Sequence, residues 1–170
     1  MAKGDDLFVE FVRTCSKGLQ HAAYLLTGDR HKAEEATQAA LTRTYAAWSS
    51  VRHKDAYAYT RKVLTNHVID GWRRPIREYP TDAVPELPSR GDVAEDVTRQ
   101  EWLLDALGRL TPRERQILVL RYFFDLPEAE VAAELEVSVG TVKSTSSRAL
   151  TKLRISIDQG ASLMCGGEGA

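Results

Sequence analysis

The sequence predicts an all-α protein that consists of two small helical domains joined by a flexible linker. Apolar residues recur at three- and four-residue spacing along most of the 170 residues, whereas the alternating pattern of a strand is nearly absent. Three prolines and a glycine interrupt the helical pattern between residues 80 and 91. A chain of this length can bury one ordinary core or two small ones, so a division at this segment is feasible.

The first domain is expected over residues 5–78 and contains three helices. The first helix ends at Gly28, because glycine readily adopts the left-handed conformation that follows many helices. The second helix is predicted from 29 to 48 and the third from 55 to 74. Pro75 ends the third helix, because proline lacks an amide hydrogen and restricts the residue before it.

The second domain is expected over residues 96–157, after a linker at 79–95. Its clearest helix start is formed by Thr111, Pro112 and Glu114. The threonine can cap the first turn, the proline fits its first position, and the glutamate can reach back to complete a capping box.

The end of the second domain carries a helix-turn-helix pattern. Pro127 opens a short helix, residues 136–137 form a turn, and Ser138 caps a further helix that ends near Arg154. This last helix has four basic side chains and no acidic ones, which is typical of a helix that contacts DNA phosphates. Helical periodicity then stops, and residues 158–170 are predicted to form a disordered tail.

Composition argues against several classes of protein. Cys15 and Cys165 lie far apart without nearby histidines, so neither a disulfide framework nor a zinc site is expected, and Cys15 is predicted to lie in the core. We find no phosphate-binding loop, metal constellation or nucleophile–base pair, so no catalytic residue, cofactor or small-molecule substrate is expected. No apolar run approaches the roughly 20 residues of a membrane helix. A cytoplasmic location without membrane insertion is therefore expected.

Several stretches of the chain resemble, in the right order, the extracytoplasmic-function sigma factors of the sigma-70 family. AYLLTGD at 23–29 points to the actinobacterial branch described as sigma-E-like. AEEATQAAL at 33–41 is similar to the family's polymerase-binding helix, and residues 58–74 are similar to its minus-ten helix. LTPRER at 110–115 is similar to the entry of its second domain. DLPEAEVA at 125–132, together with VSVGTVKS at 137–144, is similar to its DNA-binding region.

The resemblance implies that the protein binds core RNA polymerase and directs it to promoters. A sigma-2-like bundle would bind the polymerase and the minus-ten element, and a sigma-4-like helix-turn-helix domain would read the minus-thirty-five element. The implied polymerase-binding residues are Glu34, Glu35 and Gln38, whose acidic face would meet a basic coiled coil. A solvated helix face is the alternative reading of these residues.

The resemblance also implies contacts with double-stranded and melted promoter DNA. The minus-ten candidates are Ser49, Ser50, Arg52, Tyr57, Arg61, Lys62, Asn66, Arg73 and Arg74. The minus-thirty-five candidates are Gly140, Thr141, Lys143, Ser144, Thr145, Ser147 and Arg148, among which Lys143 and Arg148 are preferred. Small polar side chains followed by an arginine suit a helix in the major groove.

The aromatic residues of the third helix can be core residues or stacking surfaces for an unpaired base. Tyr59 is expected in the core, while both readings stay open for Tyr57 and Trp72. Asp70 is expected to pair with a neighbouring arginine. His67 is expected to be a packed helix residue.

Two residues depart from the family pattern. Glu136 stands where the family often has glycine, so a positive φ there would carry a strain on the order of a kcal/mol. Pro127 replaces a frequent serine or threonine cap.

Two other classes compete with the sigma-factor hypothesis. A free-standing helix-turn-helix regulator would not need the acidic face at 34–38 or the basic, aromatic third helix. An enzyme is disfavoured because the sequence lacks the catalytic constellations named above. An anti-sigma factor is a further partner that the resemblance implies.

Overall fold

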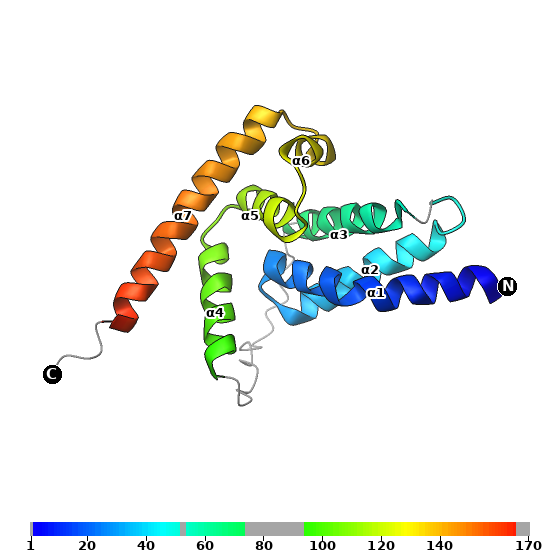
Figure 1. Ribbon diagram of the computed structural model, residues 1–170, viewed down its shortest axis with the longest axis horizontal. Helices are drawn as coiled ribbons and strands as arrows, with labels where there is room; N and C mark the ends of the chain where they lie inside the picture. Colours follow the sequence, from blue (N-terminus) through cyan, green and yellow to red (C-terminus); the bar gives the residue numbers. More distant parts are fainter. Residues whose placement is uncertain (1, 52–53, 74–93, 166–170) are drawn as a thin grey trace.

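The computed structural model describes residues 2–51, 54–73 and 94–165, and every regular element in these ranges is a helix (Figure 1). The expectation of an all-α fold is confirmed for them. The predicted linker at 79–95 lies almost entirely outside the described residues. The elements are α1 (Ala2–Thr27), α2 (Arg30–Ala46), α3 (Ala56–Arg73), α4 (Ala94–Gly108), α5 (Pro112–Leu118), η1 (Val119–Phe123), α6 (Glu128–Leu135) and α7 (Val139–Cys165).

Helices α1, α2 and α3 form the first module, and local signals set the turn between α1 and α2. Gly28 has a φ of +69°, as its role after a helix requires. The next residue, Asp29, caps α2 by accepting hydrogen bonds from the amides of His31 and Lys32 at 2.8 and 3.1 Å. The chain therefore reverses sharply, and α2 packs back along α1.

The core of the first module is built from leucines and small residues. Leu19 and Leu26 of α1 and Leu64 of α3 are fully buried. Thr44 of α2 and Thr60 of α3 are also fully buried, and their hydroxyl oxygens are 2.9 Å apart in a hydrogen bond. Because both groups are satisfied, this polar contact sets the position of α3 on α2 without a burial penalty.

The second module has a capping box at the start of α5. The Glu114 amide donates to Thr111 Oγ1 at 3.2 Å, and the Thr111 amide donates to Glu114 Oε2 at 3.2 Å. Pro112 occupies the first turn, as expected. The two reciprocal bonds satisfy amides that a helix start leaves open.

Two apolar clusters hold the second module together. One joins α5 and η1 to the helix-turn-helix, and its buried members are Ile117, Leu120, Leu126, Val131, Ala132 and Val142. The other lies between α4, α5 and α7 and contains Leu107, Leu110, Leu118 and Ala149, with Leu150 and Leu153 packed on it. The recognition half of α7 is thus supported along one face only.

Helix α7 is longer than expected. The sequence analysis placed a disordered tail at 158–170, but α7 continues to Cys165, and this expectation is wrong for residues 158–165. Gly160 was a misleading stop signal, because an internal glycine weakens a helix by only about 1 kcal/mol relative to alanine. Ala161, Leu163 and Met164 follow it and favour helix.

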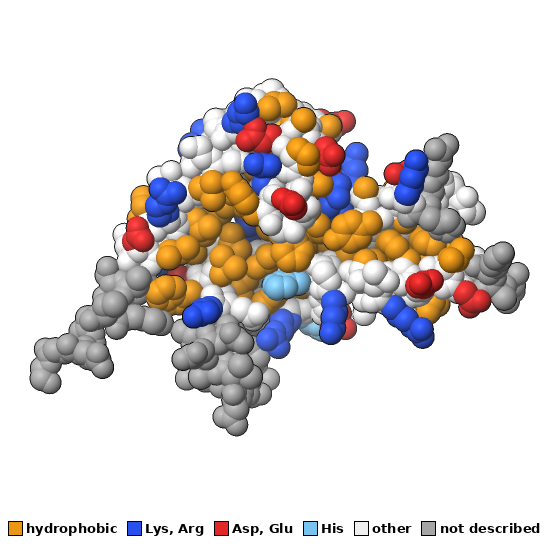
Figure 2. All heavy atoms as spheres, in the orientation of Figure 1, with side chains coloured by type: hydrophobic (Ala, Val, Ile, Leu, Met, Phe, Trp, Pro, Cys, Tyr) orange, Lys and Arg blue, Asp and Glu red, His pale blue; other side chains and the backbone are white. Residues whose placement is uncertain are grey.

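The two modules pack against each other. Val119 of η1 is 3% exposed and belongs to the same buried cluster as the α1 and α3 leucines. Phe123 and Phe124 pack against that cluster as well. A band of hydrophobic side chains crosses this face of the molecule, from the region of α4 and α7 to α1 (Figure 2).

Candidate nucleic-acid and polymerase interfaces

The first turns of α7 form the candidate reader of duplex DNA. Ser138 caps the helix, as expected, since its Oγ accepts a hydrogen bond from the Thr141 amide at 3.1 Å. The start of α7 therefore has a fixed direction, with the positive end of the helix dipole at the turn. Exposed side chains of this segment are those of Thr141, Lys143, Ser144, Ser147 and Arg148, and Gly140 is exposed beside them.

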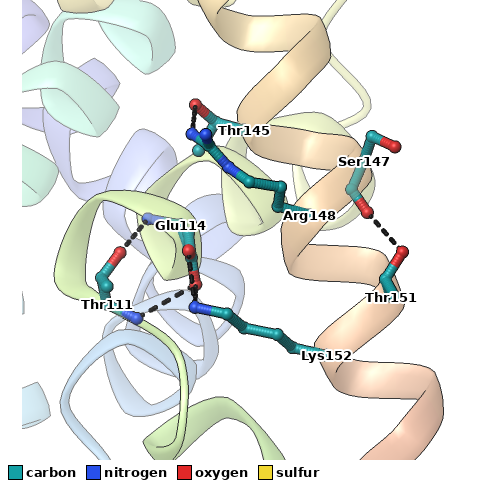
Figure 3. Close-up of polar contacts among 7 residues, drawn as sticks. All are labelled: Thr111, Glu114, Thr145, Ser147, Arg148, Thr151 and Lys152. Carbon is teal, nitrogen blue, oxygen red and sulfur yellow. Dashed lines mark hydrogen bonds and ion pairs between the residues drawn. The ribbon is translucent and has the colours of Figure 1, made fainter.

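One predicted DNA-contacting residue of α7 lies on the wrong face. Thr145 is only 4% exposed, because Val142 and Ala149, one turn before and one turn after it, are buried in the apolar clusters. Its hydroxyl accepts a hydrogen bond from Arg148 Nη2 at 3.4 Å (Figure 3). The Thr145 hydroxyl thus contacts a neighbouring side chain of the same helix and lies on its buried face.

The two preferred basic residues of α7, Lys143 and Arg148, are both exposed. Lys143 is 65% exposed, and its Nζ lies 3.8 Å from Glu128, a pairing of the kind that contributes little at a surface. Lys152 differs from both, because its Nζ donates to the Glu114 oxygens at 2.9 and 3.1 Å (Figure 3). Lys152 therefore differs from Lys143 and Arg148, because it joins α7 to α5 through Glu114.

Glu114 is expected to stabilise the second module strongly, because it is 6% exposed and serves both the capping box and Lys152. Replacing Glu114 with alanine should lower the free energy of unfolding by about 2 kcal/mol, the combined effect of a lost cap and a lost charged hydrogen bond. Urea denaturation followed by circular dichroism measures the change. The control is Glu101→Ala, which removes an exposed acid from α4. A Glu114→Ala midpoint equal to that of Glu101→Ala would contradict the assignment.

Helix α3 carries the candidate surface for the minus-ten element. Lys62 and Asn66 are exposed, and with Asp70 they line a cleft of about 230 Å³. The opposite wall of the cleft is formed by Arg113 and Gln116 of α5 and by Glu134 to Glu136 at the end of α6. Arg61 differs from its neighbours, since its side chain is 11% exposed and bonded to Glu134.

The other described minus-ten candidates lie in the turn after α2 and at the start of α3. Ser49 and Ser50 are exposed in the turn after α2, and the Ser50 hydroxyl donates to the Ala47 carbonyl at 2.9 Å. Tyr57 is 39% exposed at the start of α3, and burial of its inner part raises the pKa of its hydroxyl. The predictions for Arg52, Arg74 and the Arg73 side chain lie outside the described residues.

The aromatic residues of α3 are arranged differently from the prediction. Tyr59 was expected in the core but is 37% exposed, so that expectation is wrong. The buried row of α3 is formed by Ala56, Thr60 and Leu64, and Tyr59 lies one residue away from it. Trp72 packs on the first module's core, under the guanidinium of Arg115, 5.7 Å from its ring centre.

Helix α2 presents the candidate polymerase-binding face. Glu34, Glu35 and Gln38 are all exposed. The opposite face of the helix is buried, and its members are Ala33, Ala36, Thr37, Ala40 and Thr44. Small buried residues let α2 lie close to the core, which leaves the acidic side chains on the outer face.

Sequence reasoning missed the charged residues that join the modules. Arg115 donates to the Leu26 carbonyl at the end of α1 at 2.7 Å and to the Leu107 carbonyl at 3.0 Å. Burial lowers the pKa of this guanidinium. Glu134 of α6 accepts a hydrogen bond from Arg61 Nη2 of α3 at 3.0 Å. Charged residues on amphipathic helices are usually solvated, so nothing in the local pattern identifies these two as interface residues.

A metal-binding group and a membrane-spanning helix are both absent from the described ranges. There, no group of three or more His, Cys, Asp or Glu side chains is placed to hold a metal ion. Nor does that part of the chain contain a helix both long enough and apolar enough to span a membrane.

Comparison with protein families identifies both modules. A model of Sigma-70 region 2 matches residues 11–77, and a model of Sigma-70 region 4 matches residues 100–153. The chain belongs to the sigma-70 family. Its two modules correspond to sigma regions 2 and 4, in the predicted order. The free-standing regulator considered above is excluded, because such a protein would not carry region 2.

Individual sigma factors agree with this membership. The RNA polymerase sigma-E factor of Streptomyces coelicolor is 40% identical over 149 residues, which cover 86% of this chain and 84% of the relative. The ECF RNA polymerase sigma factor SigW of Bacillus subtilis is 26% identical over 89% of this chain and 90% of its own. The chain is therefore a sigma factor of the ECF type, and the predicted similarity to the sigma-E branch is confirmed.

Solved structures show the same fold at low sequence identity. RpoE from Bartonella quintana, a sigma factor solved with the anti-sigma factor NepR, superposes with a TM-score of 0.66 at 20% identity, covering 89% of this chain and 96% of that one. CnrH, solved with the cytosolic domain of CnrY, gives a TM-score of 0.65 at 20% identity, covering 89% and 88%.

Proposed function

We propose that the three exposed polar surfaces divide the work of promoter recognition. The acidic face of α2, with Glu34, Glu35 and Gln38, binds the core RNA polymerase. The basic face of α3 holds the melted minus-ten strand, and the first turns of α7 read the minus-thirty-five element as duplex DNA. This division assigns polymerase binding and strand capture to the first module and sequence reading upstream to the second.

The arrangement of α7 is the observation that carries this proposal. Its exposed face combines a lysine, small hydroxyl side chains, a glycine and an arginine, while its opposite face is buried in two apolar clusters. A helix that enters a major groove needs this combination, because small side chains permit close approach and long basic ones reach bases and phosphates. The buried Thr145 is removed from the contact set, and Arg148 beside it is retained.

Arg148 is expected to contact a base edge in the minus-thirty-five element. Replacing it with alanine should weaken binding to promoter duplex by about 1–3 kcal/mol and reduce the preference over a scrambled duplex. Fluorescence anisotropy with both duplexes at fixed salt measures the two effects.

Arg154→Ala is the matched control, since Arg154 is an exposed arginine later in the same helix. It should weaken binding to both duplexes equally, as loss of a general charge does. If Arg148→Ala prefers the promoter duplex over the scrambled duplex by the same factor as the wild type, Arg148 does not read the base sequence.

Run-off transcription with core RNA polymerase tests the proposal as a whole. The chain should direct initiation from a subset of a promoter library, and the transcripts should share both promoter elements. A chain that binds polymerase but selects no promoter from the library would contradict the assignment of α3 and α7 to promoter DNA.

We further infer that the chain acts by binding, without catalysis, in the cytoplasm, where polymerase and DNA are found. An anti-sigma factor is a proposed partner. Support comes from the similarity in fold to the sigma factor RpoE, which was solved in complex with the anti-sigma factor NepR. Co-purification from the native organism, with and without an excess of core polymerase, tests for a competing partner of this kind.

A further inference from the structure

An ion pair between the two modules occupies part of the candidate minus-ten surface. Arg61 of α3 donates from Nε and Nη2 to Glu134 Oε2 of α6, at 3.3 and 3.0 Å. The two side chains are 11% and 8% exposed, so water has little access to either. The Arg61 guanidinium also lies 5.8 Å from the ring centre of Phe124, in a cation–π contact. Two groups of the second module, the Glu134 carboxylate and the Phe124 ring, thus contact one basic side chain of the first.

Arg61 cannot bind Glu134 and a promoter phosphate at the same time. A promoter phosphate would bind Arg61 through the donors that Glu134 now occupies, because carboxylate and phosphate use the same guanidinium geometry. The exposed neighbours Lys62 and Asn66 face a cleft whose far wall is also the second module. That wall is partly acidic, since it includes Glu134 and Glu136.

We propose that this contact is an intramolecular latch, in which Glu134 takes the place of a promoter phosphate on Arg61 and the second module covers the minus-ten surface. Separation of the modules then frees Arg61 for DNA. The idea rests on the proposed function, because it takes α3 as the surface that holds the minus-ten strand.

The ion pair of the latch is only partly hydrogen-bonded, which favours opening. Glu134 Oε1 is buried and has no hydrogen-bond partner among the described residues, so this carboxylate is only half satisfied. Burial of a charged pair is favourable only when the remaining oxygens and hydrogens are bonded. The pair therefore selects the closed arrangement without holding it strongly. The apolar contacts of Val119 and Phe123 with the first module, and the Arg115 bond to Leu26, complete the closed interface.

Glu134→Gln is the variant that tests the latch. It keeps the shape of the side chain but leaves the Arg61 charge buried and unpaired in the closed arrangement, so the open fraction should rise. The control is Glu130→Gln, which makes the same charge change at an exposed position of the same helix. Arg61→Gln is a second variant, which breaks the latch and removes the proposed phosphate contact together. Far-ultraviolet circular dichroism verifies that each variant is folded.

Cys15 provides a readout of opening that does not involve DNA. It is 6% exposed and belongs to the same buried cluster as Val119, against which Phe123 and Phe124 pack. The chain contains two cysteines, so a Cys165→Ser background leaves Cys15 as the single thiol. The rate of its reaction with a disulfide reagent should then follow the open fraction. The second readout is the affinity of the full chain for a single-stranded minus-ten oligonucleotide, measured by fluorescence anisotropy.

Both readouts should rise by a similar factor, about tenfold, in Glu134→Gln, because each is proportional to the open fraction. Glu130→Gln should change neither by more than about twofold, as expected for an exposed charge. Arg61→Gln should raise the thiol rate without the gain in strand affinity.

Equal thiol rates in wild type and Glu134→Gln would overturn the latch itself. A raised thiol rate without a strand affinity above that of Glu130→Gln would overturn the masking. If no variant binds the strand although thiol rates differ, the assignment of α3 to the minus-ten strand fails, and the masking fails with it.

Discussion

Replacing Leu120 with alanine is expected to lower the free energy of unfolding by about 3 kcal/mol, within the range for leucines deleted from a core. Leu120 is fully buried in η1 and lies in the cluster that joins α5 to the helix-turn-helix, with Val131 of α6 and Val142 of α7. A cavity there removes contacts from both helices that position the DNA-reading surface. Duplex affinity should therefore fall together with stability.

Urea denaturation and duplex anisotropy measure the two effects of Leu120→Ala. The control is Tyr122→Ala, two residues away in η1, where the side chain is 57% exposed. That control should change the free energy of unfolding by about 0.5 kcal/mol or less, as exposed positions do. A Leu120→Ala variant as stable as Tyr122→Ala would show that this cluster does not support the module.

Reversing the charges of Glu34 and Glu35 to lysine is expected to weaken binding to core RNA polymerase by about 100-fold. Like charges across an interface cost several kcal/mol, and each 1.4 kcal/mol corresponds to about tenfold in affinity. Both glutamates are exposed, so the free energy of unfolding should stay nearly constant. Competition with a labelled sigma factor for core polymerase measures the affinity.

A control variant with two charge reversals elsewhere in the first module distinguishes the effect of this surface from the effect of net charge. Asp6→Lys with Glu10→Lys makes the same change at two exposed positions of α1. That variant should retain polymerase binding within a few-fold at physiological salt, where charges more than about 8 Å from the contact are screened. Equal losses in the two double variants would refute the specific role of α2.

The helices were predictable because their ends carry local chemistry. Gly28 supplies a left-handed residue, Thr111 completes a capping box and Ser138 caps α7, and each acts through neighbours only a few residues away. The left-handed conformation suspected at Glu136 is also present, with φ of 55° at the end of α6. Pro127 directly precedes that helix and provides no side-chain hydrogen bond to its start.

The less predictable features depend on contacts between distant parts of the chain. Thr145 has the polarity of a DNA contact, and only its position between two buried neighbours places it inside. Tyr59 has an aromatic ring at helical spacing, yet the close approach of α3 to α2 uses smaller residues. Arg61 and Glu134 are 73 residues apart, so neither predicts the burial of the other.

The π-turn of η1 determines which residues the second module presents to the first. Its bond runs from the Phe124 amide to the Val119 carbonyl, five residues back, at 3.1 Å. Each residue turns an α-helix by about 100°, so one additional residue rotates everything after it by that angle. Phe123 and Phe124 thereby pack against the core of the neighbouring module, and Phe124 also contacts the core of its own. The wider turn of η1 thus gives the second module two apolar surfaces, one for its own core and one for its neighbour.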